Sequence, residues 1–324
     1  MQNLHKSTVV ITGASSGIGR TAARTFARHG ARVVLAARNE AALTTLVREC
    51  ETLGGQAIAV PTDVGDPDAV RSLAQAATER FGPIRVWINN AGIGAVGRYV
   101  DTPMEAHRRV VETNLLGYMN GAHAVLPHFL AERSGVLINN ISFGAWAPAP
   151  FAVAYAASKF GLLGFSESLR AELADSPNIH VCDLFPSFVD TPGVQHGANY
   201  TGRVLKPAPP VYDPQRIADA MVQLALHPRR STLIGAPAWL ALLAHTVAPD
   251  LTGWVAMKFM KFYLRQADAA PVTEGNVFTP MPSGYAPRGG WQGQNRMLTA
   301  ALAVGGIVAI GMLLPGRHSR RRNR

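Results

Sequence analysis

The sequence has few features that would support a disulfide framework, a metal centre or a nucleic-acid interface. It contains only two cysteines, Cys50 and Cys182, which lie far apart and form no metal-binding spacing. We therefore expect a reducing compartment and no metal site. The net charge is +10, but the five arginines within residues 317–324 account for half of it. No long basic stripe with interleaved aromatic residues remains, so we expect no binding to nucleic acid.

The beginning of the chain shows no signal peptide, and charged residues are scarce throughout. Residues 1–7 are polar and lead directly into a β-branched run, whereas a secretory signal would have an apolar core. Charged residues make up 16% of the chain and hydrophobic residues 48%. Such a low charge content is unusual for a wholly soluble protein. We expect a cytoplasmic main domain with a membrane contact elsewhere in the chain.

One long apolar run stands near the C-terminus. Residues 297–314 contain no charge and precede the arginine-rich stretch 315–324. An 18-residue helix is about 27 Å long, just enough to cross the apolar core of a bilayer. We predict a membrane-associating apolar helix over 297–314 and a basic tail over 315–324. Three arrangements stay open: a true span, an embedded or re-entrant segment, and a buried terminal helix with a solvated tail.

Short β-branched runs alternate with helix-forming segments over residues 1–235, which we predict to be one catalytic and dinucleotide-binding domain. This alternation predicts an α/β fold, a doubly wound parallel sheet of the Rossmann type with helices on both faces. About seven strands are expected, at residues 7–12, 32–37, 56–61, 84–89, 135–142, 178–185 and 231–235.

The composition changes after residue 235. Residues 236–270 predict an apolar or amphipathic helical extension, and the Gly- and Pro-rich residues 271–296 predict a linker. Within the extension, residues 254–263 mix methionine and aromatic residues with Lys258 and Lys261. That pattern is compatible with an interfacial helix, a substrate cover or a subunit contact.

A glycine-rich turn follows the first predicted strand and leads into a predicted helix. Glycines let the backbone approach a phosphate, and a helix N-terminus offers unpaired N–H groups and partial positive charge. This position therefore predicts a dinucleotide site. The expected contacts are Gly13, Ser15, Ser16, Gly17, Ile18 and Gly19.

Residues at the ends of later strands indicate which dinucleotide is bound. Arg38 follows the second strand, and no acid occurs before Glu40. A guanidinium suits the 2′-phosphate of NADP(H), whereas NAD(H) sites place an acid here, so we favour NADP(H). The alternative is a plain surface arginine.

Asp63, beside Val64, is expected either to accept from the adenine amine or to cap the next helix. Asn90 ends the fourth strand, where small residues leave room for a ligand.

Tyr155 and Lys159 lie four residues apart in a predicted helix, so their side chains share one face. A neighbouring ammonium favours the phenolate and suits a tyrosine for proton transfer. Most such pairs are plain surface pairs, and the other motifs decide between the two interpretations. Asn114 lies on an apolar helical face and needs polar partners, and Ser142 closes the fifth strand.

Together these motifs resemble those of the short-chain dehydrogenase/reductase family, in its main, non-extended branch. The motifs are the Thr12–Gly19 turn, Asn89-Asn90-Ala91-Gly92, Asn114, Ser142 and Tyr155-x-x-x-Lys159, within a resemblance over about residues 5–235. The resemblance implies that Tyr155 exchanges a proton with the substrate oxygen, which Ser142 polarises. It implies that Lys159 lowers the tyrosine pKa and holds the nicotinamide ribose.

The resemblance also implies roles for residues around this core set. Asn114 would position a water in a proton relay, and Val189 and Thr191 would anchor the nicotinamide carboxamide. Two positions depart from the family pattern. Ser187 stands where a glycine is usual, which puts the carboxamide contacts in doubt, and Ile141 replaces a residue that is often small or hydroxylated.

We therefore predict an NADP(H)-dependent oxidoreductase that interconverts a carbonyl and an alcohol by tyrosine proton transfer and nicotinamide hydride transfer. Two alternatives are a non-catalytic NADP(H)-binding sensor or scaffold and an NAD-linked alcohol dehydrogenase. We expect a homo-oligomer and an apolar substrate, for which lipid-like, sterol-like and isoprenoid compounds are candidates. The apolar substrate is suggested by flanking aromatic residues, namely Phe143, Trp146, Phe151 and Phe188.

Overall fold

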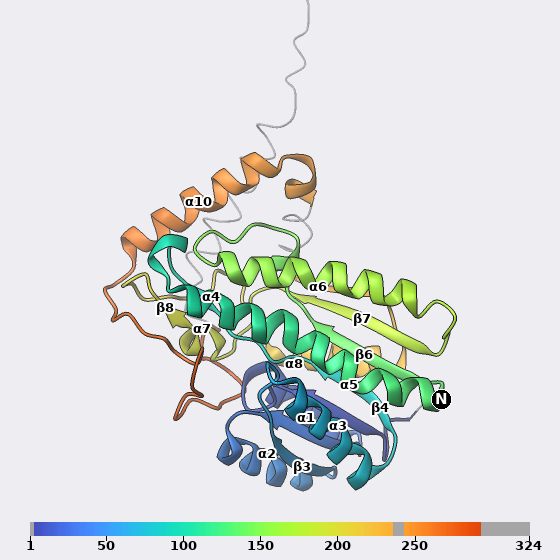
Figure 1. Cartoon of the computed structure of the whole chain (residues 1–324). Coiled ribbons are helices and arrows are strands. Elements are labelled where there is room, and N and C mark those ends of the chain that lie inside the picture. Colours follow the sequence, from blue (N-terminus) through green and yellow to red (C-terminus); the bar gives the residue numbers. More distant parts are fainter. Residues whose placement is uncertain (1–2, 236–242, 293–324) are drawn as a thin grey trace, which may run out of the picture.

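The computed structural model describes residues 3–235 and 243–292, and it contains the predicted parallel sheet (Figure 1). Seven strands pair in the order β3-β2-β1-β4-β6-β7-β9, each parallel to its neighbours. The strands are β1 (Thr8–Thr12), β2 (Arg32–Ala37), β3 (Gln56–Pro61), β4 (Ile84–Asn89), β6 (Gly135–Asn140), β7 (Ile179–Pro186) and β9 (Ser231–Ile234). The order reverses between β1 and β4, which is where ligands bind in such sheets.

Helices cover both faces of the sheet, as the alternation of segments predicts. One face carries α1 (Gly17–Arg28), α2 (Glu40–Thr52) and α8 (Pro214–Leu226). The other face carries α3 (Pro67–Phe81), α5 (Gly117–Glu132) and α6 (Val153–Glu172). The prediction of a doubly wound α/β fold is confirmed.

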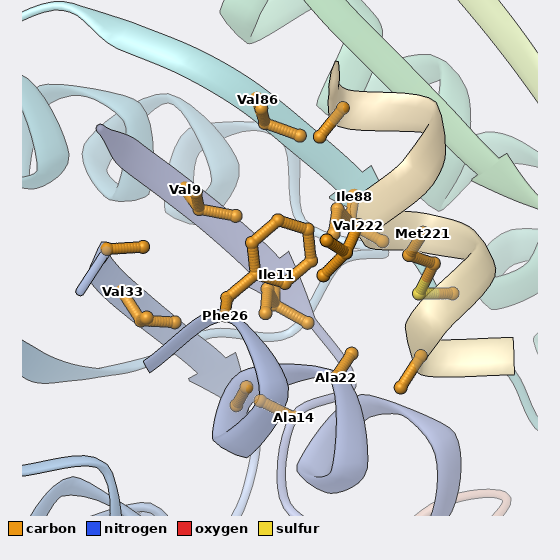
Figure 2. Packing of buried hydrophobic residues seen from close by; sticks show 14 of the residues in the cluster. Val9, Ile11, Ala14, Ala22, Phe26, Val33, Val86, Ile88, Met221 and Val222 are labelled. Carbon is orange, nitrogen blue, oxygen red and sulfur yellow. The ribbon is translucent and has the colours of Figure 1, made fainter. Parts of the chain in front are cut away.

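The core is built from strands that are buried on both faces. Successive side chains of a strand point to opposite sides, and all five residues of β1 are buried. Val9 and Ile11 pack against Phe26 of α1 and Met221 of α8 (Figure 2). Val10 points the other way and joins the cluster under α3 and α5. This two-sided burial explains why the strands read as continuous apolar runs without alternation.

The helical stretch over residues 104–132 is interrupted. It consists of α4 (Met104–Val111), a π turn (Glu112–Leu116) and α5. Single π turns inside helices are frequent at functional sites, and this one contains Asn114. Short elements complete this end of the molecule: β5 (Ala95–Val96), η1 (Tyr99–Asp101), η3 (Phe143–Ala145), α7 (Gly193–His196) and β8 (Ala198–Asn199), which pairs with β5.

The C-terminal part divides into an outer helix and an irregular segment. α10 (Pro249–Gln266) lies at the periphery, and none of its residues is buried (Figure 1). Residues 271–292 have the low helix and strand content of the predicted linker, yet they return across the carboxyl edge of the sheet. Across the two described ranges, no helix is both long and apolar enough to cross a bilayer. The apolar helix predicted at 297–314 and the basic tail lie outside these ranges.

Candidate active site

The turn between β1 and α1 has no room for side chains at two of its glycines. Gly13 has φ = +65°, and a Cβ there would lie 2.7 Å from the Cα of Ala91. A Cβ on Gly19 would lie 2.2 Å from the carbonyl oxygen of Gly13. The backbone of the turn is therefore pressed against the end of β4, as a dinucleotide-binding turn requires.

The N-terminus of α1, like those of α4, α6 and α10, has no side-chain cap. Ser16 occupies the N-cap position without making a capping hydrogen bond, and the first turn contains no acid. By contrast, the side chains of Asn39, Asp66 and Asp213 cap α2, α3 and α8. Uncapped N–H groups at the positive end of a helix dipole suit a phosphate. The turn thus fits the pyrophosphate of a dinucleotide. It contains all the contacts predicted there: Gly13, Ser15, Ser16, Gly17, Ile18 and Gly19.

Arg38 lies directly after β2, beside this turn, but its guanidinium is already engaged. It donates hydrogen bonds to the backbone carbonyl oxygens of residues 276–278. The N–H of Gly17 likewise donates to the carbonyl oxygen of Ala286, at 3.0 Å. In this structure the C-terminal segment therefore occupies two of the predicted cofactor contacts.

Asp63 lies at the end of β3, and one of the two roles predicted for it is wrong. It does not cap α3, because Asp66 stands at that N-cap and accepts from amides of the first turn. Instead, the Asp63 carboxylate forms an ion pair with Arg109 of α4. The adjacent Val64 is buried, and its carbonyl oxygen accepts from Asn120 at 2.9 Å. The predicted adenine contact of Asp63 and Val64 stays a prediction.

Asn90 ties together three strand ends at this edge. Its Nδ2 donates to the carbonyl oxygen of Thr12 at 3.0 Å, and its Oδ1 accepts from Nδ2 of Asn140 at 2.9 Å. The backbone N–H of Asn90 also donates to the Thr12 hydroxyl at 3.0 Å. These bonds hold the ends of β1, β4 and β6 in a fixed arrangement around the site.

Ser142 and Tyr155 meet where β6 passes into α6. The Ser142 hydroxyl hydrogen-bonds the Tyr155 side chain, which lowers the tyrosine pKa, but the larger effect of burial raises that pKa. Gly144 borders this pair: a Cβ there would lie 3.5 Å from both the Ser142 Oγ and the Tyr155 ring, at ordinary van der Waals distance. Ser142 has φ = +137°. Residues held in such sparsely populated conformations cluster at functional sites.

Lys159 lies one helical turn beyond Tyr155 and is buried. Its Nζ donates to the carbonyl oxygen of Asn140 at 3.5 Å and lies over the rings of Tyr118 and Tyr155. Desolvation by burial lowers the Lys159 pKa to about 7. The sequence predicts that this ammonium lowers the Tyr155 pKa, but burial raises that pKa and the opposing influence comes from the Ser142 hydrogen bond, not from Lys159.

Asn114 is fully buried, and its side chain holds the backbone of Ile93. The amide accepts from the Ile93 N–H at 2.8 Å and donates to the Ile93 carbonyl oxygen at 2.9 Å. It also donates to the Ser158 hydroxyl at 3.3 Å. Asn114 therefore has the polar partners that its place on an apolar face requires. The relay water predicted for it stays a prediction.

Val189 and Thr191 follow β7 on the far side of the glycine turn. A Cβ on Gly17 would lie 3.0 Å from the Thr191 Cβ, so the two segments touch. The unusual Ser187 is buried, and a Cβ on Gly235 would lie 2.8 Å from its Cβ. The absent side chain of Gly235 therefore accommodates the serine that we expected to disturb this loop.

Three of the four aromatic residues predicted to flank the site make ring contacts, and they fall into two groups; the fourth, Phe151, has φ = +67° and accepts from the Gly97 N–H through its carbonyl oxygen at 2.8 Å. Phe143 and Phe188 meet edge to face with ring centres 5.3 Å apart. Trp146 instead packs against Phe185, 5.4 Å between centres, in a buried cluster that also contains Ile141. The first pair lies beside the Ser142 turn and can line an apolar substrate site.

Three residues at this edge have no motif that identifies them in the sequence. The Tyr118 hydroxyl donates to the Asn140 carbonyl oxygen at 2.7 Å, and its ring lies under the Lys159 ammonium. Arg109 pairs with Asp63, and the buried Asp190 accepts from two backbone amides of the C-terminal segment. Each of these residues contacts partners that are distant from it along the chain, so the spacing of residues in the sequence does not indicate the contact.

The chain is similar to known proteins over much of the α/β domain and, for one relative, over most of its length. A family described as short chain dehydrogenase matches residues 7–199. The "Uncharacterized oxidoreductase YxnA" of Bacillus subtilis (strain 168) is 33% identical, over 95% of this chain and 91% of the relative. "Dehydrogenase/reductase SDR family member 7B" of Bos taurus is 37% identical, over 58% of this chain and 59% of that protein.

Two solved structures share the fold and contain nicotinamide nucleotides. An alcohol dehydrogenase from the archaeon Thermococcus sibiricus, complexed with 5-hydroxy-NADP, is 26% identical with a TM-score of 0.61, covering 70% of this chain and 95% of that one. A metagenomic short-chain oxidoreductase in complex with NADP is 29% identical with a TM-score of 0.61, covering 72% and 98%. As the motifs predict, the chain belongs to the short-chain dehydrogenase/reductase family of oxidoreductases.

Proposed function

We propose that this protein is an NADP(H)-dependent oxidoreductase that interconverts a carbonyl and an alcohol on an apolar substrate. The observation that carries the proposal is the hydrogen-bonded Ser142–Tyr155 pair beside a buried Lys159. A protein that only bound the nucleotide would need neither a strained serine nor a desolvated lysine at this edge. The uncapped α1 N-terminus supports the nucleotide site. Arg38 supports NADP(H) over NAD(H), because a guanidinium matches a phosphate.

In the reductive direction, Tyr155 acts as the acid. Its raised pKa keeps the phenol protonated near neutral pH, so its O–H can donate to the substrate oxygen as negative charge develops there. The Ser142 hydroxyl donates a second hydrogen bond to the same oxygen. When bound, the nicotinamide supplies or accepts the hydride.

Lys159 supports the proton transfer from behind the tyrosine. A lysine with a pKa of about 7 changes its charge close to neutral pH. Its protonated form stabilises the phenolate that Tyr155 becomes after giving up its proton. The buried Tyr118 ring and the Asn140 carbonyl oxygen fix the position of the ammonium. We also expect Lys159 to hold the nicotinamide ribose.

The first experiment is a fluorescence titration with NADPH and with NADH, on the wild type and on Tyr155→Phe, followed by turnover of apolar ketones. We expect both proteins to bind NADPH more tightly than NADH. We expect Tyr155→Phe to lose turnover by roughly 100- to 10,000-fold, because it removes the acid and keeps the ring. Tyr99→Phe makes the same change at a half-exposed ring of η1 and should leave turnover unchanged.

Four results would contradict parts of the proposal. Undiminished turnover in Tyr155→Phe would remove the tyrosine from the mechanism. NADPH binding without turnover of any carbonyl or alcohol would favour the sensor or scaffold. Tighter binding of NADH would favour an NAD-linked dehydrogenase. Activity on small polar carbonyls alone would overturn the apolar substrate class.

We also propose that the protein lies at the cytoplasmic face of a membrane, with α10 on an anionic lipid surface. The outward face of α10 carries large exposed side chains, including Trp254 at 60% and Phe262 at 58% exposure. Lys258 and Lys261 project from the same exposed part of the helix, and Lys258 lies 5.5 Å from the Trp254 ring centre. Aromatic and basic side chains on one helix face suit the headgroup region of anionic lipids.

A site-specific probe tests α10 independently of the rest of the chain. The two native cysteines are buried, so an environment-sensitive fluorophore can be attached through Phe262→Cys. We expect a blue shift with vesicles containing phosphatidylglycerol and little shift with phosphatidylcholine alone. A probe at the exposed Lys6→Cys should not respond. No shift at position 262 with anionic vesicles would exclude this surface as the lipid contact.

The predicted homo-oligomer has a candidate surface of its own. Exposed apolar side chains lie on the π turn, on α5 and on α6, and the π turn packs against α6; they are Leu116, Met119 and Phe160. We propose that a second copy covers this apolar face. Light scattering after chromatography should give a dimer or tetramer, and Phe160→Glu should shift it toward the monomer. A monomeric wild type would refute this.

A further inference from the structure

The segment from residue 273 to residue 291, called the strap below, lies over the proposed cofactor site. It starts in an antiparallel bridge between Thr273 and Asn199, beside α7 and β8. It crosses to the ends of β2 and α2, where the Asn39 side chain donates to the Tyr285 hydroxyl at 2.7 Å. It then returns past the glycine turn to Trp291. Figure 1 shows this irregular stretch between α7 and α2.

The strap uses the same groups that we assign to the cofactor. The Arg38 guanidinium donates to carbonyl oxygens of Asn276, Val277 and Phe278, the last two at 3.3 and 3.2 Å. The Gly17 N–H donates to a strap carbonyl oxygen at 3.0 Å. A phosphate oxygen and a carbonyl oxygen are both acceptors. The single N–H of Gly17 cannot satisfy both, and three of the five N–H donors of Arg38 are already engaged by the strap.

The strap is also anchored by burial and by a buried carboxylate. Val277 is fully buried in a cluster with residues that include Ile93 and Val110, and Tyr155 packs against this cluster. At the other end, Asp190 accepts from the backbone N–H groups of Gly289 and Trp291 at 3.2 and 2.7 Å. The strap therefore reaches from the adenosine side of the site to its catalytic side.

Three strap glycines match the surface below them, which argues against an accidental contact. Gly275 has φ = +51°, and its Cβ would lie 2.3 Å from the His196 carbonyl oxygen. Gly284 has φ = +84°, and its Cβ would lie 2.7 Å from the His196 ring. A Cβ on Gly289 would lie 2.4 Å from the Thr191 carbonyl oxygen. At each position a side chain would clash with the surface below and displace the strap.

We propose that the strap is an autoinhibitory element that occupies the cofactor site and must leave Arg38 and Gly17 before NADP(H) binds through them. The inference rests on the proposed function. It makes the apparent affinity for the cofactor lower than the intrinsic affinity by the fraction of molecules whose strap is released. In the opposite arrangement, the strap would cover a bound cofactor and increase the affinity for it. That arrangement predicts effects of opposite sign.

The test compares NADPH dissociation constants of the full-length wild type and variants that unseat the strap without altering a proposed cofactor contact. Val277→Asp places a charge in an apolar cluster, and Gly284→Ala opposes both the backbone conformation and the His196 ring. Val272→Asp is the matched control, because it lies just before the strap and is 61% exposed. We expect at least about tenfold tighter binding in both strap variants, and no change in the control.

Hydrogen exchange on the wild type gives a second readout that does not depend on substitutions. Saturating NADPH should speed exchange of the N–H groups of residues 276, 289 and 291, which are hydrogen-bonded in the seated strap. Slower exchange there, with weaker NADPH binding by the strap variants, would overturn the proposal and show that the strap covers the bound cofactor. Unchanged affinity in both strap variants would also overturn it.

The outcomes separate this inference from the proposed function. If the wild type binds NADPH and the strap variants bind it no better, only the strap inference fails. If the wild type binds weakly and the variants bind well, both stand. If neither the wild type nor any strap variant binds NADPH or NADH, both fail.

Discussion

The Nζ of Lys159 lies 5.6 Å from the centre of the Tyr155 ring. The same nitrogen lies 5.0 Å from the Tyr118 ring centre, and its hydrogen bond is to the Asn140 carbonyl oxygen rather than to a carboxylate. A lysine held between two rings in the interior is poorly solvated, which favours its neutral form. The arrangement therefore costs stability, as is common for the groups that carry the chemistry of an active site.

We expect Lys159→Met to stabilise the fold while abolishing turnover. Methionine fills a similar volume without a charge to desolvate, so the free energy of unfolding should rise by roughly 1–3 kcal/mol near neutral pH. Urea unfolding of both proteins measures this. Lys258→Met, the same change on exposed α10, should leave stability and turnover near wild type. A strongly destabilised Lys159→Met would mean that the ammonium is well paired in the folded state.

The stability difference between Lys159→Met and the wild type should depend on pH. The Lys159 pKa is about 7 in the folded state, against the ordinary lysine value of 10.5 that applies to the unfolded chain. Between these values the folded wild type binds fewer protons than the unfolded chain, so its stability rises with pH relative to the variant. The advantage of Lys159→Met should therefore be fully present below about pH 7 and shrink toward pH 10.5. A pH-independent difference would contradict the lowered pKa.

Two glycine-to-alanine substitutions compare the glycine turn between β1 and α1 with the interior of an ordinary helix. In Gly19→Ala the added Cβ would meet the Gly13 carbonyl oxygen at 2.2 Å, so the turn must move. We expect a loss of roughly 1–3 kcal/mol in unfolding free energy and weaker NADPH binding. Gly164 lies inside α6 with open space around its Cβ position. Gly164→Ala should gain roughly 0.5–1 kcal/mol and keep NADPH binding. Equal effects at both positions would remove the special role of the turn.

The fold is predictable from the sequence because each strand of the main sheet is marked by a local run of residues. All seven strands of the main sheet coincide with β-branched or apolar runs, since a parallel strand buried on both faces needs such residues. The glycine turn and the Ser142, Tyr155 and Lys159 set were also found by spacing. In these cases the sequence order and the topology at one sheet edge bring the groups together.

Contacts made by backbone groups were not predictable. The partners of Arg38 are carbonyl oxygens of residues 276–278, and a carbonyl oxygen is present at every residue. The Gly- and Pro-rich composition of this segment indicated irregular structure but not where it lies. Asp63 and Arg109 illustrate the same limit for side chains, because no local spacing joins a strand end to a helix face 46 residues away.

We expect Arg170→Met to destabilise the fold strongly through Asp183. The Asp183 side chain is fully buried, and Arg170 Nη1 lies 2.9 Å from its Oδ2. Removing the arginine leaves a buried charge without its partner, which costs roughly 3–5 kcal/mol. The double variant Arg170→Met/Asp183→Asn should recover part of this loss. Urea unfolding that shows additive effects of the two substitutions would contradict a direct interaction.

The pH dependence of Arg170→Met gives a further check on this pair. Burial raises the Asp183 pKa even with the arginine present, and Arg170 opposes that rise. Without Arg170 the folded state holds the Asp183 proton more tightly than the unfolded chain does, so stability falls as pH rises. The deficit of Arg170→Met relative to the wild type should thus be larger at neutral pH than in mild acid. An equal deficit at both would mean that Arg170 does not change the pKa of Asp183.

Arg38 is expected to have two competing partners, the 2′-phosphate of the cofactor and the strap. Arg38→Asp sets a carboxylate against the 2′-phosphate, so the preference for NADPH over NADH should fall by roughly 10- to 100-fold. The same substitution removes the guanidinium that holds the strap carbonyls at residues 276–278. NADH binding should therefore be no weaker than in the wild type, and tighter if the strap is released. Arg71→Asp, on exposed α3, makes the same charge change away from the site and should alter neither affinity. Equal losses for NADPH and NADH in Arg38→Asp would show that Arg38 does not recognise the 2′-phosphate.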